Sequence, residues 1–297
     1  MSPQYHVHEP DPFLIQFTET IGIRYYGLAY ILGFGIAAGL LWIYWRRGRS
    51  PITPAAQGDL MFAGMLGTFI GGRLGFFLFY SPGTLLEDPV QLVRIWEGGM
   101  ASHGGFIGVF VGVWWAAHKH RIPLVTAGDI AVTLAPAGLM LGRLANYING
   151  ELWGNVIQSH VPWAVIFTTS APPGTNPLLI EPRHPSQLYE AALEGLVLLV
   201  YTQWRIWCTP VVTRAPGRLA GEFLLGYAVA RVISEHFREH DVGIEPFLGL
   251  NRGAWLSLGL LAAGAWLIAT SAARGRAAAA RAYGRSDTPP TDPGSSR

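Results

Sequence analysis

The sequence contains little cysteine and few charged residues, and both features limit the classes of protein to which it can belong. Cys208 is the only cysteine among 297 residues, so an intramolecular disulfide and a cysteine-based metal cluster are excluded. Charged residues make up 13% of the chain, whereas soluble domains usually carry about 25%. The formal net charge of +2 gives no indication of a nucleic-acid partner.

Apolar residues are abundant instead, and they indicate a membrane protein. Half of the residues are hydrophobic, and the chain holds 11 Trp and 37 Gly. Aromatic belts at the bilayer interface and close helix contacts favour these two residue types. The N-terminal stretch MSPQYHVHEPDPF lacks the basic region of a cleavable signal peptide. We therefore expect the first apolar run to act as an uncleaved anchor.

Seven apolar runs have the length that a membrane-spanning helix needs, about 17–25 residues. They cover approximately residues 22–45, 58–80, 98–118, 124–147, 188–208, 218–237 and 254–273. The sequence thus predicts an all-α integral membrane protein with seven transmembrane helices.

The basic residues predict the orientation of these helices. Of the 21 Lys and Arg residues, 13 fall in one alternating set of connecting segments and five in the other, while Arg73, Arg143 and Arg231 belong to the spans themselves. Because cytoplasmic loops carry the excess of Lys and Arg, we expect the N-terminus outside and the C-terminus in the cytoplasm.

Three regions follow from this topology. Residues 1–21 would form an N-terminal arm on the outer side, and residues 22–273 the seven-helix body. A small cap on the outer side, with a strand-like WAVIF stretch, would be inserted at about 150–185. Residues 274–297 change to Ala and Arg and then to Ser, Pro, Thr and Asp. We expect this basic cytoplasmic tail to be disordered and to lie near anionic lipid.

The stretch GRLANYINGELWG, residues 142–154, places several polar side chains at the end of an apolar run. An arginine at the centre of a membrane helix costs about 2.5–3.5 kcal/mol on insertion scales, so such residues usually face protein or a watery cavity. The polar residues of this stretch are Arg143, Asn146, Asn149 and Glu151. Asn149-Gly150 is a turn signal, so the helix is expected to end there. A polar helix cap with snorkelling side chains would be the purely structural explanation.

The sixth predicted span carries a second polar face. Tyr227, Arg231 and Glu235 are spaced at i, i+4 and i+8, so they share one side of a helix. A self-neutralising Arg231–Glu235 pair would explain them without any function.

Three further polar features have simple structural explanations when taken alone. His103, in SHGGFIGV, would be an interfacial histidine, and Tyr26, in RYYGLAY, an interfacial tyrosine. RHPSQLYE, residues 183–190, would be a capping segment in which Ser186 caps the helix. Glu190 and Glu194 would then lie near the start of that helix, where the helix dipole stabilises acidic side chains.

The predicted orientation nevertheless assigns these polar groups to the same outer half of the bilayer. They come from four different helices: Tyr26, His103, Arg143, Asn146, Glu151, Tyr227, Arg231 and Glu235. Because guanidinium groups match phosphate oxygens geometrically, two arginines at headgroup depth suggest a phospholipid ligand.

The motif GRLANYINGELWG resembles the signature of the prolipoprotein diacylglyceryl transferases of bacteria. The resemblance extends to RYYGLAY, GGRLGFFLFY, SHGGFIGV, RHPSQLYE and FLLGYAVARVISEHFRE. One departure is Ala254, where the family usually has a glutamine. The resemblance implies transfer of the diacylglyceryl group of phosphatidylglycerol to the lipobox cysteine of a prolipoprotein at the periplasmic side of the inner membrane, with release of glycerol-1-phosphate. It implies no metal and no organic cofactor.

The resemblance also implies roles for matching residues. Arg143 and Arg231 would hold the leaving phosphate, and His103 would take the thiol proton, although an arginine-bound phosphate is an alternative acceptor. Glu151 and Glu235 would orient the arginines. Substrate contacts or close backbone approach are implied for the remaining matching positions, Tyr26, Asn146, Gly154 and Tyr227. Cys208 lies on the predicted cytoplasmic side and would take no part.

Other functional classes fit the sequence less well. A transporter would need polar groups toward both faces. An intramembrane protease using Ser102 and His103 is disfavoured because adjacent helical residues point about 100° apart. A protein that merely binds lipid would need no such complete set of matching residues.

We expect a monomer whose partners are phosphatidylglycerol, prolipoproteins and membrane lipids.

Overall fold

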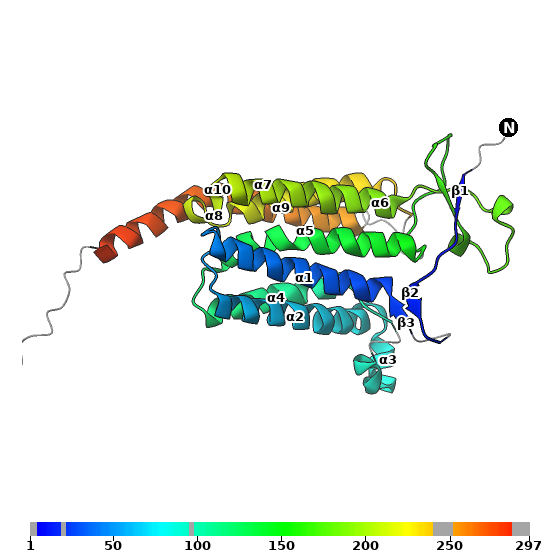
Figure 1. Cartoon of the computed structure of the whole chain (residues 1–297), viewed down its shortest axis with the longest axis horizontal. Helices are drawn as coiled ribbons and strands as arrows, with labels where there is room; N and C mark the ends of the chain where they lie inside the picture. Colours follow the sequence, from blue (N-terminus) through cyan, green and yellow to red (C-terminus); the bar gives the residue numbers. More distant parts are fainter. Residues whose placement is uncertain (1–4, 19–21, 95–97, 240–251, 287–297) are drawn as a thin grey trace, which may run out of the picture.

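The computed structural model describes residues 5–18, 22–94, 98–239 and 252–286. Its body is a bundle of long helices that lie side by side and reverse direction from one to the next (Figure 1). The first half of the bundle contains α1 (Tyr25–Arg46), α2 (Pro54–Tyr80), α4 (Ser102–Lys119) and α5 (Leu124–Ile148). Short helical segments α3 (Pro82–Glu87) and η1 (Pro89–Val93) follow α2.

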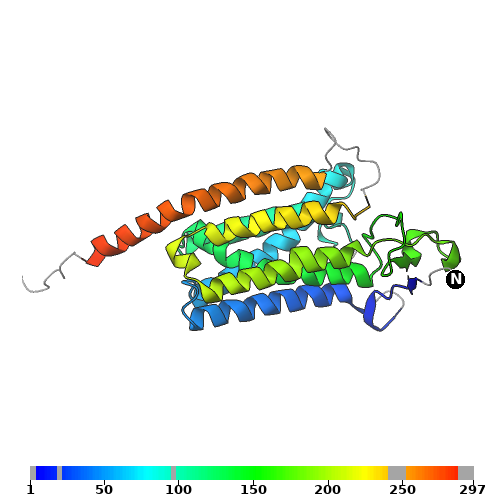
Figure 2. The same cartoon turned by 90° about the horizontal axis from the view of Figure 1, so that it is seen from above.

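The second half contains a composite helix and two further long helices. The composite helix joins α6 (Ser186–Glu190), the π-helical segment η5 (Ala191–Val197) and α7 (Leu198–Cys208). The short α8 (Val211–Arg214) leads to α9 (Arg218–Glu235), and α10 (Arg252–Ser286) packs along α9. Figure 2 shows α10 extending past the end of the other helices.

Among the described residues, four helices are long and apolar enough to cross a membrane, judged by length and composition: α1, α2, α5 and the part of α10 from Ser257 to Ala280. The other predicted spans correspond to α4, to the α6–η5–α7 helix and to α9. Large apolar side chains point outward from each of these seven helical segments, among them Ile31, Phe62, Phe110, Leu144, Val200, Val229 and Trp266. Exposed apolar surface of this extent is typical of contact with lipid or protein rather than water.

Helices α2 and α4 approach each other through facing glycines. Gly67, Gly71 and Gly75 of α2 recur every fourth residue, and Gly104, Gly108 and Gly112 of α4 do the same. An added Cβ at Gly71 would overlap the carbonyl oxygen of Gly104. Backbone contact therefore replaces side-chain packing here, as in small-residue interfaces between membrane helices.

A cluster of buried apolar side chains lies toward the end of the bundle where α1 ends and α2 begins. It includes Leu41, Tyr44, Ile52, Ile130 and Leu219. Nearby, the Asp129 carboxylate accepts hydrogen bonds from the backbone nitrogens of Gly217 at 2.6 Å and Ala220 at 2.8 Å. Asp129 of α5 thereby caps the first turn of α9 from outside that helix.

A small cap covers the opposite end of the bundle (Figure 1). Strand β1 (His6–His8) pairs in parallel with β4 (Val165–Phe167), and β2 (Phe13–Gln16) pairs antiparallel with β3 (Gly22–Arg24). Short 3-10 turns η3 (Thr168–Ser170) and η4 (Pro177–Leu179) complete it. The strand expected in WAVIF is confirmed as β4.

Helix boundaries differ from the predicted spans by a few residues, and two differences change the type of structure expected. The first span begins at Tyr25, because residues 22–24 belong to β3. The tail from Arg274 was expected to be disordered, yet α10 continues to Ser286. The physical reason is the high helix propensity of its alanines. Residues 287–297 lie outside the described residues.

Candidate active site

The end of α5 turns the GRLANYINGELWG motif back toward the bundle. The helix stops at Ile148, as the Asn149-Gly150 turn signal predicts, and Gly150 takes a φ of +65°. Leu152 also takes a positive φ, +56°, which is uncommon for a residue with a side chain. Side chains of the composite helix hold this turn, since Gln187 Nε2 donates to Glu151 O at 2.7 Å and Ser186 Oγ donates to Leu152 O at 3.1 Å.

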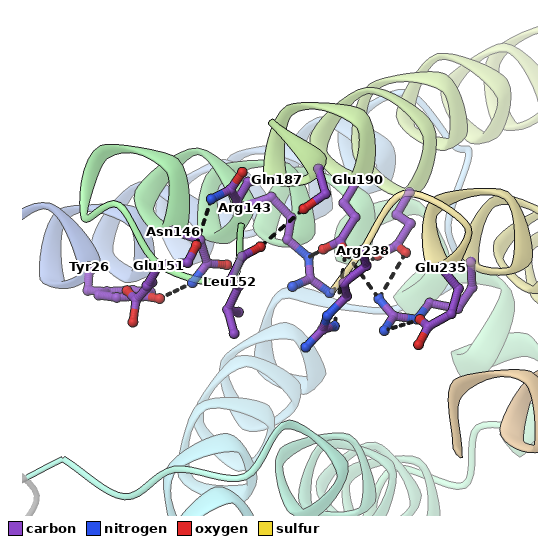
Figure 3. A network of polar contacts seen from close by, with 12 residues as sticks. Tyr26, Arg143, Asn146, Glu151, Leu152, Gln187, Glu190, Glu235 and Arg238 are labelled. Carbon is purple, nitrogen blue, oxygen red and sulfur yellow. Dashed lines mark hydrogen bonds and ion pairs between the residues drawn. The ribbon is translucent and has the colours of Figure 1, made fainter. Parts of the chain in front are cut away.

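Arg143 is fixed by two glutamates of the composite helix (Figure 3). Its Nε lies 2.7 Å from Glu190 Oε2, and its Nη2 lies 3.5 Å from Glu194 Oε2. The side chains of Glu190 and Glu194 are 2% and 0% exposed, whereas Arg143 keeps 18% of its side chain accessible. The carboxylates therefore lie behind the guanidinium group, and part of the cation faces outward.

Arg231 of α9 meets the same two carboxylates. Its Nη1 lies 3.5 Å from Glu190 Oε1 and 3.4 Å from Glu194 Oε1. Its Nη2 lies 2.8 Å from Glu235 Oε2, so the intrahelical pair expected from the i, i+4 spacing is confirmed. Arg238 Nη1 approaches Glu190 Oε1 at 4.0 Å. Among the residues that the structure describes, three arginines and three glutamates thus form one network whose formal charges balance.

A second polar group lies beside this network (Figure 3). Asn146 Nδ2 donates to the Tyr26 hydroxyl, which also hydrogen-bonds with Glu151. Asn149 Nδ2 donates to Glu151 Oε1 at 3.1 Å. Glu151 was expected to orient an arginine, but these contacts join it to Tyr26 and Asn149. The carboxylates at Arg143 are those of Glu190 and Glu194.

Gly154 lies where three chain segments meet. Its nitrogen donates to His184 O at 2.9 Å, and its backbone forms a bridge with Arg238. A Cβ there would lie 2.5 Å from Phe237 O and 2.6 Å from His184 O. Only glycine fits this close approach between segments of the chain.

The other predicted site residues are less closely joined to the arginines. Tyr227 stacks on Phe223 with 6.0 Å between ring centroids and interacts electrostatically with Arg231 and Glu194. His103 lies half-buried in the first turn of α4. Ala254 lies in the first turn of α10, and its side chain is outside the described residues.

Sequence reasoning missed the importance of Glu190 and Glu194. It treated them as residues that favour a helix dipole, with Ser186 as the cap. The structure instead has Pro185 at the N-cap position, and the Ser186 hydroxyl donates to Leu152 O. The available signal was two glutamates four residues apart within an otherwise apolar span, since such a pair needs cationic partners.

The arrangement offers two partly exposed guanidinium groups from different helices, held at one depth by shared carboxylates. Tyr26, Asn146 and Glu151 supply hydroxyl, amide and carboxylate groups nearby. Arginine pairs of this kind bind phosphate groups, and the surrounding apolar helices suit acyl chains.

Comparison with known proteins identifies the family. A family model described as prolipoprotein diacylglyceryl transferase matches residues 12–270. The chain belongs to the prolipoprotein diacylglyceryl transferase family.

Its relatives resemble it over most of their length. The chain is 44% identical over 253 residues to a phosphatidylglycerol–prolipoprotein diacylglyceryl transferase of Zymomonas mobilis, covering 85% of each protein. It is 41% identical over 289 residues to the protein of that name from Rhizobium meliloti, covering 92% of this chain and 95% of the relative.

Proposed function

We propose that this protein transfers the diacylglyceryl group of phosphatidylglycerol to the lipobox cysteine of prolipoproteins, the first step of lipoprotein maturation. The observation that carries the proposal is the convergence of Arg143 and Arg231 on the same two buried carboxylates at the cap end of the bundle. Membership of the family agrees with it.

The reaction needs a cationic site because its leaving group is a phosphate. The cysteine sulfur attacks the glyceryl CH2 carbon that carries the phosphate. A C–S bond forms, the C–O bond breaks, and the electron pair leaves with glycerol-1-phosphate. Arg143 and Arg231 stabilise the charge that develops on the phosphate oxygens, which is commonly a large catalytic term. Tyr26 and Asn146 bind headgroup or ester oxygens beside them.

The thiol must lose its proton during this step. A free thiol has a pKa of about 8.5, so a base increases the reactive thiolate fraction. His103 is the proposed base, and the arginine-bound phosphate is the alternative acceptor. His103→Gln distinguishes them: a lower rate with a changed pH profile supports the histidine, whereas an unchanged rate and profile remove it from this role.

The proposed location is the bacterial inner membrane, with seven spans, the cap and reaction site on the periplasmic side, and the C-terminus in the cytoplasm. The exposed apolar side chains on all seven helical segments support this topology, as does the distribution of basic residues. We propose a monomer that works without metal or organic cofactor. A cysteine-accessibility experiment tests the orientation, because Cys208 should react with permeant but not with impermeant thiol reagents in intact cells.

The activity is tested with the purified full chain, phosphatidylglycerol and a lipobox peptide in detergent. Mass spectrometry should detect the peptide carrying one diacylglyceryl unit together with glycerol-1-phosphate. Arg143→Ala should abolish both products.

Arg205→Ala is the matched control. Arg205 is 14% exposed and paired with Glu222 at 2.7 Å, but it lies at the opposite end of the bundle. That variant should keep both products. Absence of product from folded wild-type protein that binds phosphatidylglycerol would contradict the proposed function.

A further inference from the structure

Two carboxylates at the site are more deeply buried than any of the arginines they bind. The side chains of Glu190 and Glu194 are 2% and 0% exposed, against 18% for Arg143 and 14% for Arg231. A buried carboxylate is tolerated only when it is paired and hydrogen-bonded. These two side chains therefore cannot reach substrate themselves, and the arginines lie between them and the accessible surface.

The pairing is shared rather than one-to-one. Glu190 approaches Arg143 at 2.7 Å and Arg231 at 3.5 Å, and Glu194 approaches the two arginines at 3.5 and 3.4 Å. A single pair would orient one guanidinium group only. Two carboxylates that each contact both arginines fix the separation and relative tilt of side chains that come from different helices.

The backbone of the composite helix is shaped to place these carboxylates. Glu190 ends α6, and Glu194 lies within the π-helical segment η5. Single π-helical turns are rare and frequently occur at functional sites. Gly195 lets this segment touch α5, since an added Cβ would lie 2.8 Å from the Cα of Met140. Met140 is one helical turn before Arg143, so the close contact brings Glu194 to the arginine.

Charge alone does not explain the two glutamates. If the site only attracted phosphate, carboxylates beside both arginines would weaken it, because they offset the positive potential at short range. Their advantage is geometric, since stabilisation of a transition state depends on donors that are already in place.

We propose that Glu190 and Glu194 are positioning residues for the transfer, which hold Arg143 and Arg231 at the spacing that the leaving phosphate requires. This inference rests on the proposed function. Neutralising either carboxylate adds net positive charge to the site, so phosphatidylglycerol should bind as well as before or more tightly. Turnover should nevertheless fall, because the arginines are no longer held in place.

The test compares kcat and KM for phosphatidylglycerol in wild type and Glu194→Gln, using the full chain with a lipobox peptide. We expect kcat to fall about 10- to 100-fold, because a 1 Å misplacement of a reacting group can cost about 100-fold. KM should stay equal or decrease. Glu222→Gln is the control, since Glu222 also bridges two arginines, Arg205 and Arg218, at the far end of α9, and kcat should stay within about twofold of wild type.

Two results would overturn the inference. One is a kcat for Glu194→Gln within about twofold of wild type. The other is a rise in KM of more than about threefold, whatever happens to kcat, because the carboxylate would then support binding itself.

Gly195→Ala decides the question if Glu194→Gln does not fold. This change keeps every charge and moves η5 away from α5, so the same loss of kcat is expected, and a normal kcat would contradict the positioning. Absence of product from wild type would contradict the proposed function instead. An active wild type together with an unchanged kcat in Glu194→Gln would contradict the positioning alone.

Discussion

Arg73 and Arg143 occupy similar local sequences, GRLG and GRLA, yet they are held in opposite ways. Arg73 of α2 is 4% exposed and donates to backbone carbonyls, those of Gln91, Leu92, Arg94, Gly98 and Gly99. Arg143 of α5 is bound by the carboxylates of Glu190 and Glu194 and stays partly accessible.

The difference separates a cation that the structure holds internally from one proposed to bind substrate. Arg73 donates its hydrogen bonds to neutral carbonyls of the segment after α2, and its guanidinium group is buried. Arg143 is held by Glu190 through Nε and by Glu194 through Nη2, and its Nη1 lies outside these two ion pairs. The same tripeptide is thus held by backbone carbonyls in one helix and by carboxylates in another, and only the second arginine stays partly accessible.

Exchanging each arginine for lysine gives the largest predicted contrast. Arg143→Lys should lower kcat/KM about 100- to 1000-fold, since lysine lacks the forked donors that match a phosphate, with little change in Tm. Arg73→Lys should instead lower Tm by about 5 °C, because lysine offers fewer donors to the carbonyls, and cost much less activity. Activity and thermal-unfolding measurements on both variants check this, and equal effects would break the comparison.

The next largest effect is expected on folding, at the glycine contact between α2, which carries Arg73, and α4. Gly71→Ala should sharply reduce the yield of monodisperse protein, because the new Cβ meets the backbone of α4. Gly64→Ala on the same helix is the control, as nothing lies within 4 Å of its added Cβ. Size-exclusion chromatography in detergent measures both, and equal yields would contradict the close contact.

A smaller effect is expected from Gly154, on the side of the molecule that contains Arg143. Gly154→Ala should lower activity about tenfold through displacement of the segment that carries Arg238, since overpacking forces backbone shifts. Gly35→Ala, in open surroundings, should leave activity unchanged. If the two variants were equally active, the junction at Gly154 would have no influence on the site.

The smallest predicted effect concerns pH and the cap. Burial, followed by the neighbouring His236, lowers the pKa of His184 below its usual value. The folded protein therefore favours neutral His184, whereas the unfolded chain takes up a proton as the pH falls through about 6.5. Tm should thus decrease slightly from pH 8 to pH 5.5, and less so in His184→Gln. An identical decrease in both proteins would remove His184 as its source.

Much of the helical framework was predictable from the sequence because lipid imposes a simple rule. Long apolar runs, the turn at Asn149-Gly150 and the strand in WAVIF were all readable from local pattern. The helical part of the tail was missed because its alanines and arginines were interpreted by charge rather than by helix propensity.

The site was predictable only in part, for a physical reason. Arg143 and Arg231 are conspicuous because a charged residue in an apolar run is costly. The partnership of Glu190 and Glu194 with both arginines depends on a π-helical segment and on the contact of Gly195 with Met140. Neither feature has a signature in local periodicity.

A structure of the protein with bound phosphatidylglycerol would test the central claim most directly. The account predicts phosphate oxygens about 2.7–2.9 Å from guanidinium nitrogens of both Arg143 and Arg231, the usual range for such charged hydrogen bonds. A phosphate bound to other cations, with Arg143 and Arg231 still closed onto Glu190 and Glu194, would contradict it.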